Sequence, residues 1–208
     1  MKKGEKRKQE LLQIAYRLFL TRGYENTSVD EIIEAAGIAK GTYYYYFQSK
    51  EQMLEAVIGM MIEAEAQAAR QVLASELPVP QKIVGIVASV HPTQDEQPIE
   101  DLLNRPENVL MHKKIREQLL EAMVPLLAEA VEEGVRNGMF ACDHIRERVK
   151  MLLILSSELF DEANYTAPEV DVFVDVMETL LGAAPGTMDL VRALITLEAA
   201  SAEGGETE

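Results

Sequence analysis

The sequence predicts an all-α protein, and two observations support this fold class. Apolar residues recur at spacings of three and four along nearly the whole chain of 208 residues, which is the period of an amphipathic helix. We find no strand pattern of comparable length and no internal repeat. Apolar residues make up 48% of the chain and charged residues 26%, which is typical of a globular protein with its own core.

Capping residues mark where the expected helices begin and end. A Ser or Asp side chain can accept hydrogen bonds from the free amides of a first helical turn, and a glycine can adopt the left-handed conformation that ends a helix. The expected helices are one with an apolar face from Leu11 to Phe19 that ends at Gly23, one from Ser28 to Gly37, one over 40–47, one that begins with Ser49-Lys50-Glu51-Gln52, and others over about 80–91, 95–104, 107–137, 143–164, 168–182 and 187–199.

Charge divides the chain into two parts. The formal net charge is −15, which by itself argues against a nucleic-acid partner. Residues 1–50, however, hold nine Lys or Arg against six Asp or Glu, while the rest holds 11 against 29. Attraction to phosphate is local, on the scale of a Debye length of ~8–10 Å, so a basic module can act beside an acidic body. We expect one domain over 1–50, a second helical domain over 51–198 and a disordered acidic tail over 199–208.

Several functional classes are unsupported by any motif. The single cysteine, Cys142, excludes an intramolecular disulfide and a CxxC motif. No apolar run reaches the ~18 residues that span a bilayer, and no apolar stretch follows the basic start, so we expect a cytoplasmic protein without a membrane partner. Phosphate-loop, GxSxG and HExxH patterns are missing. We therefore predict no enzyme, no catalytic residue, no metal site and no cofactor.

Residues 28–47 have the spacing of a helix-turn-helix, with Gly37 at the turn. The second of these helices contains Thr42-Tyr43-Tyr44-Tyr45-Tyr46, so aromatic rings point around most of its circumference. Tyrosine combines flat apolar area with a hydroxyl that can donate to a phosphate or a base edge. Two interpretations remain open here: a DNA-binding surface, or rings that are partly core and partly exposed without function.

These residues resemble the DNA-binding domain of TetR/AcrR-type transcriptional regulators over about residues 8–57. The matching segments are Ala15-Tyr16-Arg17-Leu18-Phe19, Gly23-Tyr24, Thr27-Ser28-Val29, Ile32, Ala35-Ala36-Gly37-Ile38, Lys40 to Phe47, and Ser49-Lys50-Glu51. The resemblance implies an N-terminal three-helix domain of the helix-turn-helix type and a C-terminal helical domain that binds a ligand and dimerises. It also implies a repressor that binds a pseudo-palindromic double-stranded operator as a homodimer and is released by a small-molecule effector.

The resemblance assigns DNA contacts to particular positions. The residues so implied are Thr27, Ser28, Lys40, Gly41, Thr42, Tyr44, Tyr45, Tyr46 and Lys50. In the family pattern Lys50 contacts a phosphate, whereas Tyr24, Tyr43 and Phe47 pack inward. Ala39 departs from the pattern, which usually has serine or another polar residue there; this removes a cap or a phosphate contact worth ~1 kcal/mol. The basic start (Lys2, Lys3, Lys6, Arg7 and Lys8) is either an arm that reaches DNA or a solvated tail.

Two apolar helices near the C-terminus favour a dimer. Two such helices can pair with the same two of a second subunit as a four-helix bundle. The predicted interface residues are Leu152, Leu153, Leu159, Phe160, Phe173, Val174, Met177 and Leu180. The alternative is that these side chains belong to an ordinary core. A dimer would place two reading helices about one DNA turn apart, ~34–36 Å, or slightly more.

The helix over 107–137 is the predicted place for an effector pocket. The predicted lining residues are Met111, His112, Ile115, Leu119 and Met123. Thioether side chains repack easily around different ligands, and the chain has ten methionines. The alternative is again a plain core. Residue patterns alone also leave open a ligand-independent or activating DNA-binding protein of the same fold.

Overall fold

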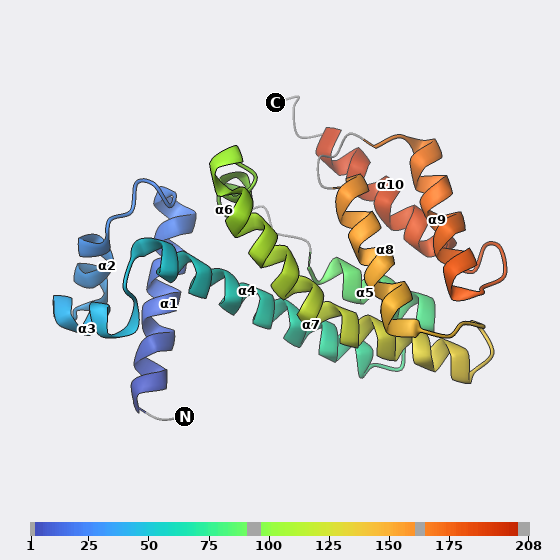
Figure 1. Cartoon of the computed structure of the whole chain (residues 1–208), viewed down its shortest axis with the longest axis horizontal. Coiled ribbons are helices and arrows are strands. Elements are labelled where there is room, and N and C mark those ends of the chain that lie inside the picture. The colour runs from blue at the N-terminus through green and yellow to red at the C-terminus, as the bar shows by residue number, and fades with distance from the viewer. Residues whose placement is uncertain (1–2, 91–96, 161–164, 204–208) are drawn as a thin grey trace. The chain divides into compact units, whose positions relative to one another are not determined.

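The computed structural model describes residues 3–90, 97–160 and 165–203, and every regular element in these ranges is helical (Figure 1). This confirms the all-α prediction. The helices are α1 (Lys3–Arg22), α2 (Val29–Ala36), α3 (Lys40–Tyr46), α4 (Lys50–Leu73), α5 (Val79–Ala88), α6 (Gln97–Leu103), a 3₁₀ turn η2 (Pro106–Asn108), α7 (Val109–Arg136), α8 (Ile145–Phe160), α9 (Ala167–Leu181) and α10 (Asp189–Glu203). None of the described helices has a stretch that is long and apolar enough to cross a membrane.

The chain divides into two compact units. The first comprises residues 1–65 and 91–119, and the second comprises residues 66–90 and 120–208. This division differs from the expected boundary after residue 50, because the long helices α4 and α7 each contribute to both units. Within the first unit, the Lys114 ammonium of α7 lies 2.7 Å from the Glu55 carboxylate of α4.

The core of the first unit joins α1 to the helix-turn-helix. Helix α1 packs against α2, and α2 against α3 (Figure 1). The buried side chains here include Leu11, Ala15, Phe19, Ile32, Tyr43, Phe47, Met53, Leu54 and Val57. Tyr43 and Phe47 therefore pack inward as predicted. Aromatic and aliphatic side chains supply most of the burial, at ~25 cal/mol per Å² of apolar surface removed from water.

Local capping fixes the ends of α2 as the sequence predicts. The Ser28 hydroxyl accepts from the Glu31 amide, and the Glu31 carboxylate accepts from the Ser28 amide, which completes the capping box. Gly37 ends the helix at φ 59°, a conformation that costs glycine little. Ala39, by contrast, begins α3 with no side-chain cap.

The start of α4 is a variant of the predicted box. The Ser49 hydroxyl accepts from the Gln52 amide at 3.1 Å. The Gln52 side chain returns to the Gln48 amide instead of the Ser49 amide. The returning hydrogen bond thus reaches one residue before Ser49, in the connection between α3 and α4.

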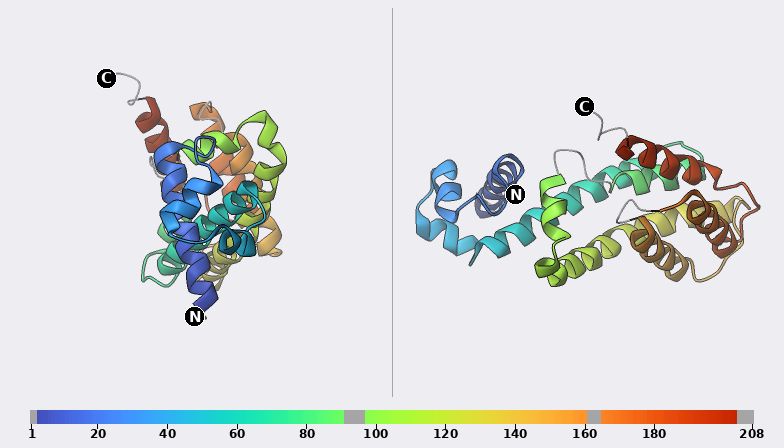
Figure 2. Two further views of the ribbon diagram at one scale, coloured as in Figure 1. Left: turned by 90° about the vertical axis from the view of Figure 1, so that its left-hand side faces the viewer. Right: turned by 90° about the horizontal axis from the view of Figure 1, so that it is seen from above.

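The second unit is built around α9, which packs beside α8 and α10, while α10 also packs on α5 (Figures 1 and 2). The buried side chains include Ile83, Ile86, Phe140, Val149, Phe173, Val174, Leu181 and Met188. Two charged side chains are buried among them: the Lys82 ammonium of α5 lies 2.7 Å from the Glu133 carboxylate of α7, and the Glu178 carboxylate of α9 accepts from the Met188 amide at 2.8 Å. A buried charge of this kind is stable only when it is paired.

Two expected helix boundaries in this unit are wrong. Asp143 does not cap α8: its carboxylate accepts from the Arg148 guanidinium at 2.8 Å, and α8 begins after His144, whose carbonyl accepts from the Arg148 amide. Helix α10 runs to Glu203, four residues past its expected end, so 199–203 are helical. The rest of the expected tail and of the 143–164 helix lies outside the described residues.

Candidate nucleic-acid interface

Tyr43 anchors α3 and thereby decides which of its tyrosines face outward. Its side chain is 0% exposed, and its hydroxyl donates to the Ser49 carbonyl at 3.3 Å. Its ring lies edge-on to Tyr44, with centroids 5.3 Å apart, and 6.0 Å from Phe47. Burial raises the pKa of Tyr43 to about 12, so the phenol is neutral at pH 7. With one side of α3 so fixed, the opposite side must face solvent.

The outward side of α3 is aromatic. Tyr45 is 79% exposed and Tyr44 41%, an unusual exposure for such large side chains. Tyr46 is half-buried, with its ring edge-on to Tyr45 at 4.9 Å between centroids. Thr42 is also half-buried. The ring of Tyr43 thus belongs to the core, whereas the rings of Tyr44 and Tyr45 are accessible to a partner such as DNA.

Gly41 leaves a gap in this surface. A β-carbon built on Gly41 would meet no atom of the chain within 4 Å. The fold therefore does not require glycine there, and alanine would be the better helix former by up to ~1 kcal/mol. A glycine that the chain itself does not need suits the close approach of another molecule to the helix backbone.

Two lysines beside α3 are already partnered. The Lys40 ammonium lies 3.0 Å from the Asp30 carboxylate, and this hydrogen bond raises the pKa of Lys40. Both side chains are well exposed, so the pair stabilises the fold by little. The Lys50 ammonium donates to the Tyr24 carbonyl at 3.0 Å and lies 4.1 Å from the centre of the Tyr24 ring.

Thr27 is the one residue among the predicted DNA contacts that is buried. Its side chain is 0% exposed, and its hydroxyl donates to the Gly23 carbonyl at 2.9 Å. The Thr27 hydroxyl thus serves the Gly23 carbonyl just beyond the end of α1, and its side chain is not accessible to DNA in this structure. Ser28 remains exposed, but its hydroxyl is bonded to Glu31 within the capping box.

The basic start of the chain forms the first turns of α1. A β-carbon on Gly4 would lie 3.6 Å from the Tyr46 hydroxyl, and the Lys8 ammonium lies 5.6 Å from the centre of the Phe47 ring. These contacts place Gly4 and the exposed Lys8 beside the end of α3. Residues 3–8 are thus helical, and their contact with DNA stays a prediction; Lys2 lies outside the described residues.

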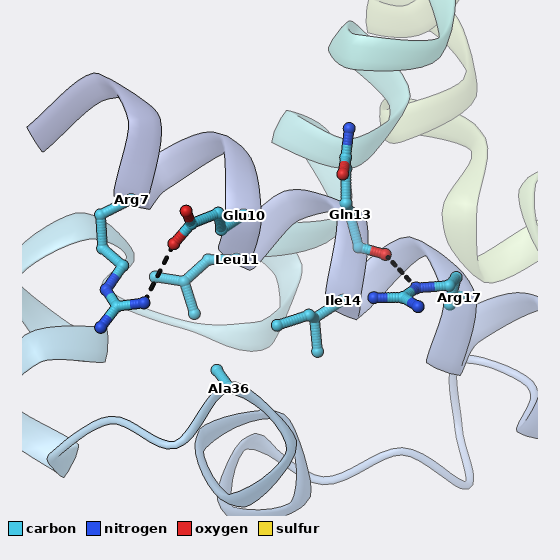
Figure 3. Close-up of a pocket in the computed structure, with 7 residues that line it drawn as sticks. All are labelled: Arg7, Glu10, Leu11, Gln13, Ile14, Arg17 and Ala36. Carbon is cyan, nitrogen blue, oxygen red and sulfur yellow. Dashed lines mark hydrogen bonds and ion pairs between the residues drawn. The ribbon is translucent and has the colours of Figure 1, made fainter. Parts of the chain in front are cut away.

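A shallow hollow of about 190 Å³ lies between α1 and α2. Figure 3 shows Ala36 of α2 facing Leu11 and Ile14 of α1, with Arg7 and Arg17 on either side. Arg7 pairs with Glu10, and the Arg17 guanidinium donates to the Gln13 carbonyl. The hollow is smaller than the ~300–1,000 Å³ of most small-molecule pockets, and we assign it no ligand.

Many of the predicted dimer residues are buried within the chain itself. Leu152, Phe173, Val174 and Met177 are all under 9% exposed, whereas Leu153, Leu159, Phe160 and Leu180 are half-buried. The Phe160 ring lies edge-on to that of Phe173, 5.1 Å between centroids, inside the α8–α9 pair. Buried side chains have little surface left for a second subunit, so Leu152, Phe173, Val174 and Met177 are poorly placed for such a contact.

A different set of side chains on the same two helices is exposed. Met151 and Val172 are each 61% exposed, and Ile154 is 39% exposed. On α9, Val172 lines an open hollow of about 280 Å³ together with Val176 and Leu180. We call Met151, Ile154, Val172, Val176 and Leu180 the outer face. Sequence periodicity missed most of it because α8 and α9 are apolar on more than one side.

The predicted effector-pocket residues do not gather around a described hollow. Met123 is buried in the second unit, while Met111, His112, Ile115 and Leu119 are half-buried in the first. Their role stays a prediction. Among the described residues, no three His, Cys, Asp or Glu side chains lie together as metal ligands would.

Helix α2, the left-handed turn at Gly37 and helix α3 with its exposed tyrosines are arranged as in DNA-binding proteins of the helix-turn-helix class. Residues 11–57 match the family model described as bacterial regulatory proteins, tetR family. The repressor KstR2 of Mycolicibacterium smegmatis is 30% identical over 148 residues, which cover 66% of this chain and 69% of that protein. The regulator EthR of the same species is 24% identical over 175 residues, covering 80% and 81%.

A solved structure has the same fold. RolR in complex with resorcinol superposes with a TM-score of 0.65 at 20% identity, covering 93% of this chain and 94% of the other. The chain belongs to the TetR family of bacterial regulatory proteins. It is a DNA-binding transcriptional regulator.

Proposed function

We propose that this regulator is a repressor that binds a pseudo-palindromic operator as a homodimer and releases it when a small-molecule effector binds. The observation that carries the DNA contact is the outward side of α3, where Tyr44 and Tyr45 are exposed beside Gly41 while Tyr43 fixes the helix from within. The exposed rings supply contacts to base edges, and Lys40 and Lys50 supply contacts to phosphates. A chromosomal operator places the regulator in the cytoplasm.

The outer face of α8 and α9 supports the dimer. Exposed aliphatic side chains at Met151, Ile154 and Val172 lose contact with water when a second copy of the same helix pair covers them. A two-fold arrangement makes such a face self-complementary. Because one short α3 reads too few base pairs, two copies related by the two-fold axis are needed for a specific operator.

Two relatives support repression and effector release. KstR2 is named a transcriptional repressor, and RolR has been solved with resorcinol bound. For this chain the proposed effector site is the middle helices, with Met111, His112, Ile115, Leu119 and Met123 as its candidate lining. An effector that prefers one of two spacings of the DNA-binding units by ~1–3 kcal/mol changes operator affinity by about five- to 150-fold.

The test is to measure binding of the purified protein to DNA from upstream of its own and neighbouring genes. Fluorescence anisotropy at ~150 mM salt, with random DNA as competitor, reports this binding. A specific regulator should prefer its operator over random DNA by ~10³ or more, with at least two protomers on each site. The same assay then screens small molecules for release. Binding of every fragment no better than random DNA, by protein shown free of bound ligand by mass spectrometry, contradicts the proposal.

A further inference from the structure

A second cluster of interacting side chains lies at the junction of α1, α2 and α4. Lys50 is the first residue of α4, and Tyr24 lies in the connection between α1 and α2. The Lys50 ammonium donates to the Tyr24 carbonyl at 3.0 Å and lies 4.1 Å from the centre of the same residue's ring. One tyrosine thus holds the ammonium by both its backbone and its ring face.

Tyr24 is itself held on two sides. Its ring lies edge-on to the fully buried Phe19, with centroids 5.3 Å apart. Its hydroxyl is hydrogen-bonded to Glu51, and the Ser49 hydroxyl bonds to the same carboxylate. These hydrogen bonds lower the pKa of Glu51, so it is ionised at pH 7. Burial, with Glu51 nearby, raises the pKa of Tyr24, so the ring stays neutral.

We propose that Tyr24 is a positioning residue: it holds the Lys50 ammonium in place, before DNA arrives, for contact with a phosphate. The inference rests on the proposed function and adds a residue that does not itself touch DNA. An ammonium has three donors, and the Tyr24 carbonyl takes one, which leaves two for phosphate oxygens. The aromatic face of Tyr24 attracts the Lys50 ammonium, and the ionised Glu51 nearby adds its own electrostatic attraction.

The free lysine side chain is flexible, and ordering it upon binding costs affinity. Because Tyr24 already orders the Lys50 side chain in the folded protein, this loss of entropy does not fall on the binding step. Removing the ring should therefore weaken DNA binding while the charge, and with it the released counterions, stays the same. Removing the charge should weaken binding and also lower the salt dependence by about 0.9 in the slope of log K against log salt.

The experiment is a double-mutant cycle on the full-length protein, with anisotropy measured at several salt concentrations on operator DNA. Tyr24→Leu should weaken binding about three- to tenfold with an unchanged salt slope. Lys50→Met should weaken binding and lower the slope by about one. In the Lys50→Met background, Tyr24→Leu should have no further effect, because Tyr24 acts only through Lys50.

Two controls separate positioning from a general loss of packing. Tyr24→Phe keeps the ring and the carbonyl and should bind as the wild type does. Ile32→Val trims a buried side chain elsewhere in the first unit and should leave DNA affinity unchanged at a temperature where all variants are folded. If Ile32→Val reproduces the loss seen for Tyr24→Leu, the effect is structural and the inference is wrong.

A measurement without DNA tests the geometry directly. The Lys50 ε-methylene protons should resonate upfield of ordinary lysine in the wild type and in Tyr24→Phe, and shift back in Tyr24→Leu. Ordinary shifts in the wild type overturn the inference. Additive effects of Tyr24→Leu and Lys50→Met, with operator binding intact, overturn it while the proposed function stands. A wild type that binds no DNA specifically overturns both.

Discussion

Helix α3 and the outer face of α8 and α9 both leave large side chains uncovered, but the two surfaces differ in chemistry. On α3 the exposed side chains are tyrosines, with Lys40 alongside. On the outer face they are aliphatic, and the neighbouring charged side chain at the α9 hollow is Asp175. Tyrosine keeps a hydroxyl for a polar partner, whereas Met151 and Val172 gain only by leaving water.

The difference shows that exposure alone does not identify a partner. A polyanion approaches a surface of hydroxyls and cations, and an acidic body repels it. An aliphatic face in an acidic unit is suited to another apolar face, such as its own copy.

The largest effect is expected from a charge on the outer face. Val172→Glu should weaken self-association by more than 100-fold, because an unpaired carboxylate buried in an apolar interface costs ~3–5 kcal/mol. Sedimentation equilibrium would measure it, and operator binding should fall with it. Leu190→Glu is the control, since Leu190 is 41% exposed on α10. Equal disruption by both substitutions would remove the outer face from the proposed dimer.

The next effect is expected on α3. Tyr45→Ala should weaken operator binding by about tenfold or more, as interface tyrosines often do, with little change in the free energy of unfolding. Leu110→Ala serves as the comparison, because Leu110 is 81% exposed in the first unit but lies on α7. Anisotropy with operator and random DNA measures both variants. Wild-type affinity in Tyr45→Ala would exclude its ring from the interface.

Gly41 should separate stability from binding. Gly41→Ala is expected to raise the free energy of unfolding by up to ~1 kcal/mol while it weakens DNA binding several-fold, because a methyl group blocks close approach. Gly59→Ala is an exact counterpart within α4, where a β-carbon also meets no atom within 4 Å. Thermal unfolding measures the stability of both variants, and anisotropy measures their affinity for DNA. A Gly41→Ala protein that binds DNA as tightly as Gly59→Ala would mean that α3 is not approached closely there.

The smallest effect is expected from the Asp30–Lys40 pair. Asp30→Asn should release the Lys40 ammonium and remove a negative charge, so that affinity for all DNA rises a few-fold. Stability should change by less than ~1 kcal/mol, as for other exposed pairs. Binding measured with operator and random DNA should show the same gain. A gain restricted to the operator would instead assign Lys40 a base contact.

The sequence by itself determined the features whose causes are local. The helical period needs only neighbours three and four residues away, and the capping box at Ser28 and the left-handed Gly37 need only the adjacent turn. The same holds for the spacing of the helix-turn-helix and for the uncapped Ala39. The box at Thr166 and Glu169 likewise depends only on residues within one turn.

Only the tertiary structure decided which apolar side faces where. Phe173 and Val172 are neighbours of similar hydropathy, yet one is buried and the other exposed, because α8 and α10 cover only one side of α9. Thr27 became a buried partner of the Gly23 carbonyl, and Tyr24 met Lys50 from 26 residues away. Such contacts depend on how helices pack, and residue patterns along one helix carry no record of its neighbours.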